Sequence, residues 1–210
     1  MSLTKDISVN RLYRKDLRLE YFTIGYNILE AAASIVFGSI ANSIALIGFG
    51  LDSIVESLSG LVLAWRLRQH GRISEAAEEK LEKRATRLVA ITFFILGAYV
   101  LFQSVKNLVL ADIPAPSLPG IVIALASMVV MPVLAWQKSK TGKQINSRAL
   151  VADSKETLAC AFLSVALLLG LGANYLLGFW QADSIVGLII AVFLFREGGE
   201  GWRKSGEEES

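Results

Sequence analysis

Six apolar segments dominate the sequence, and each is long enough, or nearly so, to cross the ~30 Å hydrocarbon core of a bilayer as a helix. The charged residues are bunched between these segments rather than spread along them, and they make up only 19% of the chain. This pattern predicts an all-α, polytopic integral membrane protein. The predicted transmembrane helices cover about 21–40, 43–65, 88–110, 118–136, 148–177 and 183–196.

Lysine and arginine residues alternate between the connections that join these segments. Five precede the first segment, seven follow the second, four follow the fourth starting at Lys138, and three follow the sixth. The connectors around 41–42, 111–117 and 178–182 contain none. By the positive-inside rule, this alternation predicts six spans with both termini in the cytoplasm, in a membrane such as a bacterial inner or plasma membrane.

We therefore expect a cytoplasmic N-terminal arm (1–20), a six-helix transmembrane domain (21–197) and a short cytoplasmic tail (198–210). Residues 75–87 are good helix formers, and they predict either a short cytoplasmic helix or an extension of the third transmembrane helix. Asp183 is a candidate cap for the last helix. The basic residues lie in several short loops rather than on one face, which argues against nucleic-acid binding.

Two carboxylates, Asp52 and Glu56, interrupt an otherwise uncharged segment between Ser43 and Trp65. Their i, i+4 spacing places both on one helix face, where two unpaired negative charges would repel each other. Acids inside a membrane are costly, and they mark functional sites by default. A divalent cation would neutralise both groups, whereas the structural alternative is that they pair with Lys155 or hydrogen-bond to a neighbouring helix.

The fifth segment offers partners for this pair, because Glu156 and Cys160 are also spaced i, i+4. Two facing helices could supply three carboxylates and one thiolate, a set that suits Zn²⁺ and also Cd²⁺, Co²⁺, Fe²⁺ or Mn²⁺. The alternative for Cys160 is that it packs as a small apolar residue. Asp153 shares the Glu156 side of the helix, and its alternative role is a charge that is stabilised near a helix N-terminus.

Three further polar residues have less specific interpretations. Glu30 stands alone in the first segment with Asn27 one turn earlier, which suggests a supporting contact to the site or a proton relay. His70, the single histidine, lies in a basic connector and is not expected to bind metal. Because Cys160 has no histidine near it in the sequence, a thiol–imidazole enzyme is not expected.

Three motifs together carry a resemblance to a known family. The segments "SIALIGFGLDSIVESLSG", "RALVADSKETLACAFLSVALLLG" and "QADSIVGLIIAVFLFREG" resemble the second, fifth and sixth transmembrane helices of the cation diffusion facilitators, in order and at matching spacing. In that family the second and fifth helices each carry a pair of ligands. These four ligands bind a divalent cation, typically Zn²⁺, which is exported in exchange for protons. The resemblance implies that Asp52, Glu56, Glu156 and Cys160 bind the metal, with Glu30, Asn27 and Asp153 in support.

This sequence departs from the family pattern at three of those positions. Glu56 stands where an Asp is usual, Glu156 where a His is usual, and Cys160 where a second Asp is usual. Without the His, Glu56 or Glu156 would have to carry the exchanged protons. The family's usual cytoplasmic domain after the sixth helix is not expected here, so a homodimer would have to form through the membrane helices, where Gly97 and Ala98 would permit close packing.

The sequence thus predicts a proton-coupled exporter of a divalent transition metal, with the metal as substrate and no tightly bound cofactor. Its predicted partners are the lipid bilayer, the cation and protons. The alternative is a membrane metal-binding or assembly protein that does not transport and whose intramembrane acids are structural.

Overall fold

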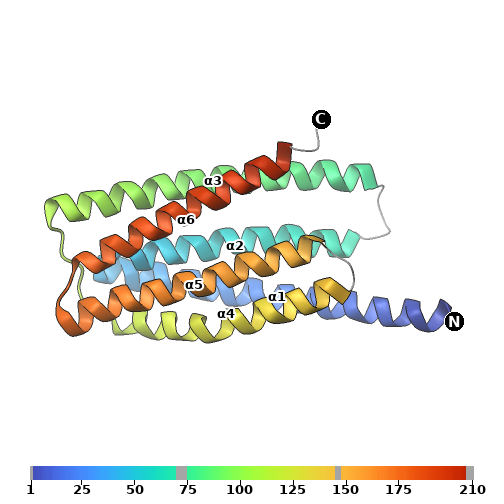
Figure 1. The fold of residues 1–210 in the computed structure, drawn as a ribbon, viewed down its shortest axis with the longest axis horizontal. Coiled ribbons are helices and arrows are strands. Elements are labelled where there is room, and N and C mark those ends of the chain that lie inside the picture. The colour runs from blue at the N-terminus through green and yellow to red at the C-terminus, as the bar shows by residue number, and fades with distance from the viewer. Residues whose placement is uncertain (1, 70–74, 145–147, 207–210) are drawn as a thin grey trace.

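The computed structural model describes residues 2–69, 75–144 and 148–206, and in these ranges the chain forms six helices (Figure 1). Five of them contain a stretch that is long and apolar enough to cross a membrane. The helices are α1 (Ser2–Ala41), α2 (Ile44–Gln69), α3 (Glu75–Leu110), α4 (Leu118–Gln144), α5 (Arg148–Leu177) and α6 (Gln181–Gly206). The predicted all-α, six-helix fold is confirmed.

The outer surface of the bundle is apolar, while many of its polar side chains are inside. Leu29, Phe162 and Leu176 are among the large apolar residues that are more than half exposed. Asp52 and Lys138 are among the charged residues that are buried. A surface of this kind suits contact with lipid tails, because the hydrocarbon core of a bilayer does not solvate charged groups. Together with the lengths of the spans, it identifies a multi-pass integral membrane protein.

Several helices extend beyond the apolar segments that predict them. α1 begins at Ser2, so the residues of the expected N-terminal arm continue the first helix. α3 begins at Glu75, which confirms that residues 75–87 extend the third helix. α4 continues through Pro132 and past Lys138 to Gln144, so the prediction that Lys138 lies in a loop is wrong. A helix does not have to end where its apolar stretch ends if its polar residues find partners.

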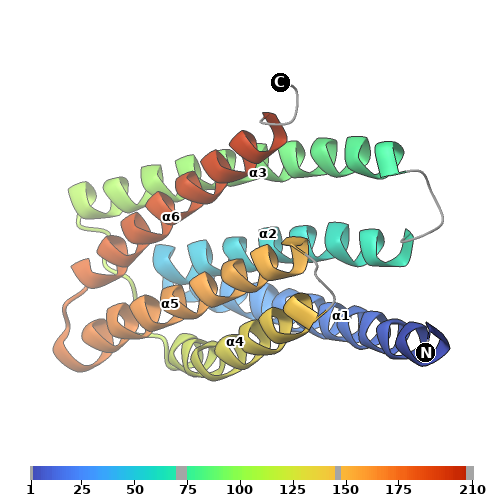
Figure 2. The same cartoon turned by 45° about the vertical axis from the view of Figure 1, so that its right-hand side comes forward.

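The helices pack as three close pairs, α1 with α2, α3 with α6, and α4 with α5. In both views α2 and α5 lie between the α3–α6 pair and the α1–α4 side of the bundle (Figures 1 and 2). α2 also contacts α3, α5 and α6. This central position explains why polar groups on α2 and α5 are shielded from lipid.

The start of α1 and the end of α6 lie at the same end of the bundle, which we call the terminal end (Figure 1). α2 and α4 end there, and α3 and α5 begin there. At the opposite end, the α3–α4 connector joins the end of α1 through a hydrogen bond from Ala115 N to Ala41 O (2.7 Å). The helix ends that carry the Lys and Arg residues assigned to connections by the sequence are therefore at the terminal end.

Asp183 caps a helix, but not the one that the sequence suggests. It lies in the first turn of α6, where its carboxylate accepts a hydrogen bond from Ser43 Oγ and another from Ile44 N (2.9 Å). Its side chain thus satisfies the N-terminus of α2, where free N–H groups and the helix dipole favour a negative charge. The contact fixes the start of the helix that carries Asp52 and Glu56.

We expect Asp183→Ala to lower the free energy of unfolding by about 2 kcal/mol, because it leaves buried donors at Ser43 and Ile44 without an acceptor. Thermal unfolding of the purified protein in detergent measures this as a lower Tm. Asp112→Ala removes a carboxylate from an exposed connector position and serves as the control. Equal Tm values for the two variants would contradict the capping role.

Close contacts at glycines bring the helices of the α1–α2 and α3–α6 pairs together. A Cβ atom added at Gly50 of α2 would lie 2.9 Å from Ser34 Cβ on α1, so the two backbones approach closely there. Gly97 is buried within the chain, where an added Cβ atom would lie 3.4 Å from Leu194 Cβ on α6. Gly97 therefore serves the α3–α6 contact, whereas Ala98 is exposed and remains available to a second copy.

Candidate cation site

The acid pair of α2 faces the interior of the bundle. Asp52 and Glu56 are 4% and 7% exposed, and they occupy successive turns of one helix face. Both oxygens of Glu56 are buried without a close hydrogen-bond partner among the described residues, and the Thr157 and Cys160 side chains of α5 face them. A carboxylate in this position needs either a proton or a cation.

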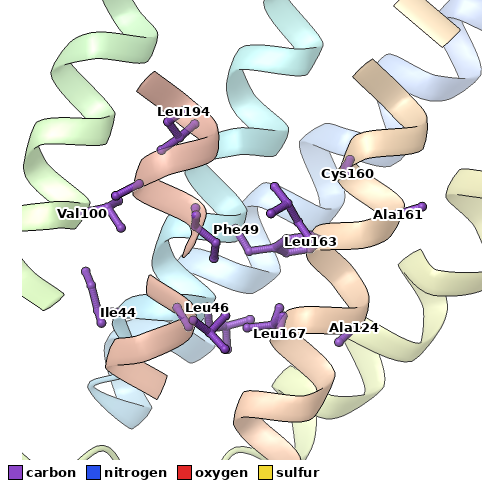
Figure 3. Packing of buried hydrophobic residues seen from close by; sticks show 14 of the residues in the cluster. Ile44, Leu46, Phe49, Val100, Ala124, Cys160, Ala161, Leu163, Leu167 and Leu194 are labelled. Carbon is purple, nitrogen blue, oxygen red and sulfur yellow. The ribbon is translucent and has the colours of Figure 1, made fainter. Parts of the chain in front are cut away.

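Cys160 of α5 lies beside this pair. Its thiol is buried, and it is close enough to both Asp52 and Glu56 for their charges to act on it. Figure 3 shows Cys160 on α5, one turn from Leu163 and at the border of the apolar core. Three of the four predicted ligands, namely Asp52, Glu56 and Cys160, are therefore neighbours.

Glu156, the fourth predicted ligand, lies one turn from Cys160 toward the start of α5, and its side chain is half-buried. Among the side chains that the structure describes, no three from His, Cys, Asp and Glu gather closely enough to hold a metal ion. The four-ligand set therefore stays a prediction. Cation binding through all four residues would require the Glu156 side chain to turn toward the acid pair.

Glu30 of α1 lies beside the same group of side chains. Its Oε2 accepts a hydrogen bond from Ser53 Oγ (2.8 Å), and Ser53 is the neighbour of Asp52 on α2. The charge of Glu30 acts on both Asp52 and Cys160. Asn27 is fully buried one turn earlier, and neither of its amide atoms has a hydrogen-bond partner among the described residues. The supporting roles of Glu30 and Asn27 stay predictions.

Asp153 does not simply stabilise the start of α5, because it forms an ion pair. Lys138 Nζ of α4 lies 2.5 Å from Asp153 Oδ2 and 3.3 Å from Glu20 Oε2 of α1. Sequence reasoning missed this cluster because it assigned Glu20 to an arm and Lys138 to a loop. The sequence did contain a signal for this cluster. Each of the three residues lies near one end of its apolar segment, and these three segment ends meet at the terminal end of the bundle.

The remaining charged residues near the acid pair, or predicted to be near it, are Glu197 and Lys155. Glu197 of α6, outside the span predicted from apolar residues alone, acts electrostatically on Asp52. Lys155, the predicted structural partner of the acid pair, is exposed, whereas Asp52 and Glu56 are buried. His70 lies outside the described residues.

The family described as "Cation efflux transmembrane domain" matches residues 21–208. The chain belongs to the cation efflux family. The match to this cation efflux domain covers α2, α5 and α6 completely and α1 from residue 21 onward. It therefore includes Glu30, Asp52, Cys160 and Glu197.

Relatives of this cation efflux domain include proteins from animals, archaea and bacteria. Transmembrane protein 163 of Xenopus laevis is 22% identical over 88% of this chain and 65% of its own length. An uncharacterized transporter of Methanocaldococcus jannaschii is 23% identical over 80% of this chain and 60% of its own length. The manganese efflux system protein MneP of Bacillus subtilis is 26% identical over 81% of this chain and 60% of its own length. The chain therefore spans about three fifths of the length of these relatives.

Proposed function

We propose that this chain is the transmembrane unit of an exporter that moves a divalent transition metal out of the cytoplasm in exchange for protons. In this proposal Asp52, Glu56, Glu156 and Cys160 bind the cation between α2 and α5. The terminal end faces the cytoplasm, as the positive-inside rule predicts from the Lys and Arg residues of its connections.

One observation carries the proposal, which is the excess of buried negative groups in the core. Among the buried side chains that the structure describes, Lys138 is the one Lys or Arg, and it already pairs with Glu20 and Asp153. In the described part of the chain no ion pair joins Asp52, Glu56 or Glu30 to a basic side chain, although the charge of Lys138 reaches Glu56. Buried acids without a counter-charge bind protons or cations, and a cation that replaces the protons couples the two fluxes.

The donor set supports a borderline metal. Carboxylates accept hard and borderline cations, while a thiolate favours softer ones, so three carboxylates with one thiolate suit Zn²⁺ best. Cd²⁺, Co²⁺, Fe²⁺ and Mn²⁺ are the other candidates, and one relative is named a manganese efflux protein. Glu30, Asn27 and Asp153 support the site or relay protons.

The structural alternative is that the acids only stabilise the fold of a membrane protein that does not transport. It predicts that Asp52 and Glu56 pair with Lys155. The exposure of Lys155 counts against that pairing and favours a cation site.

Transport by purified protein in sealed liposomes tests the function. We expect uptake of Zn²⁺ from a panel of divalent cations, together with proton movement in the opposite direction that a pH-sensitive dye reports. Metal binding without any flux would instead support the alternative. We also propose a homodimer through the membrane helices, and a monomer mass for the protein in nanodiscs would refute it.

A further inference from the structure

The ammonium group of Lys138 occupies a site built from three helices. It is 1% exposed, and its Nζ contacts Asp153 Oδ2 (2.5 Å), Glu20 Oε2 (3.3 Å) and Thr157 Oγ1 (3.4 Å). Glu20 comes from α1, and Asp153 and Thr157 come from successive turns of α5. Three oxygen-bearing side chains thus contact one cation that the chain itself supplies, and the charge of Glu56 also acts on it.

This cluster lies between the terminal end and the candidate cation site. Along α5, Asp153, Thr157 and Cys160 follow one another turn by turn from the terminal end inward. Along α2, which runs in the opposite direction, Glu56 lies nearer the terminal end than Asp52 does. The polar side chains therefore form a line of neighbours that runs from Lys138 through Thr157 and Glu56 to Asp52 and Cys160.

The opposite end of this line is closed by the apolar core. One turn beyond Asp52 and Cys160, α2 and α5 contribute the buried side chains of Phe49 and Leu163, followed by Leu46 and Leu167 (Figure 3). These four side chains are apolar, so they offer a hydrated ion no ligand. The polar line therefore runs from the Asp52 and Cys160 side chains toward the terminal end.

We propose that the Lys138 ammonium is a tethered cation that closes the path from the terminal end to the side chains of Asp52, Glu56 and Cys160. The carboxylates of Glu20 and Asp153 would attract a divalent cation, but the ammonium fills the space between them and repels a second positive charge. The path opens when Lys138 leaves this site. That the path serves a transported metal rests on the proposed function, whereas the closure itself does not.

Cys160 provides a direct test of the closure, because it is the single cysteine of the chain and lies at the inner end of the line. A small cationic thiol reagent, 2-aminoethyl methanethiosulfonate, is added to the protein in nanodiscs, and mass spectrometry follows the labelling of Cys160. We expect Lys138→Met to raise the labelling rate about tenfold or more, because the unpaired buried carboxylates draw in water and cations. Lys138→Arg keeps the charge and should label within about twofold of the natural protein.

Lys140→Met is the matched control, since it removes an exposed lysine two residues further along α4. Asp153→Asn keeps the side-chain shape and weakens the ion pair, so it should raise the labelling rate by a smaller factor. If Lys138→Met does not give monodisperse protein, the labelling rate of Asp153→Asn alone decides between closure and no closure. Unchanged labelling in both variants, or an equal rise in Lys140→Met, would overturn the proposal. Because the readout needs no metal, it can succeed even if the chain does not transport one.

Discussion

Asp52→Asn protein in sealed liposomes is expected to show a metal flux at least about 100-fold lower than that of the natural protein. Substitution of a residue that only hydrogen-bonds to a metal ligand already costs about 10- to 100-fold, and a ligand should cost at least as much. The amide has nearly the same shape as the carboxylate, but it carries no charge and does not release a proton when metal binds. The coupled proton signal should disappear together with the metal flux. Metal uptake and dye fluorescence, recorded in the same sample, measure both.

Asp112→Asn is the control for this variant, because it makes the same chemical change at an exposed position in the α3–α4 connector. It should retain the metal flux of the natural protein. Retention of full flux by Asp52→Asn would mean that the acid pair of α2 does not bind the transported cation.

Cys160→Ala is expected to change the metal preference. Loss of a thiolate ligand should weaken Zn²⁺ and Cd²⁺ binding by at least about tenfold, because substitution of a residue that only hydrogen-bonds to a metal ligand already has an effect of that size. Binding of Mn²⁺, which prefers oxygen ligands, should change by less than about threefold. Isothermal titration of the purified protein with each metal measures the three affinities.

Cys160→Ser separates this effect from packing, because a serine fills nearly the same space and supplies an oxygen in place of the sulfur. It should lose Cd²⁺ affinity more than Mn²⁺ affinity, as the alanine variant does. If all three metals bind both variants as they bind the natural protein, Cys160 is a packing residue of the apolar core.

The order of the six helices, five of which are long and apolar enough to cross a membrane, could be predicted from the sequence, because a bilayer imposes a minimum length on each apolar segment. The inward direction of Asp52 and Glu56 could also be predicted, since two acids on one face of a lipid-embedded helix must point away from lipid. The residues at which the helices end could not be predicted, because polar residues such as Lys138 and Glu20 continue a helix when another helix supplies their partners.

The Lys138–Asp153–Glu20 cluster shows why charge placement is harder to predict than helix placement. Each of these residues lies at the edge of an apolar segment, where an exposed position in a loop is the ordinary outcome. The distance between them depends on how α1, α4 and α5 pack, which no single segment specifies. The same reason applies to Asp183, which caps α2 across the bundle rather than its own helix.

The central claim is that carboxylates and the Cys160 thiolate together bind the transported cation. X-ray absorption at the zinc edge of the metal-loaded protein tests it most directly, because it reports the type and distance of each ligand. We predict one sulfur at about 2.3 Å and oxygen ligands at about 2.0–2.2 Å, with the sulfur signal absent from Cys160→Ser protein. An all-oxygen shell in the natural protein, or an unchanged sulfur signal in the serine variant, would contradict this account of the site.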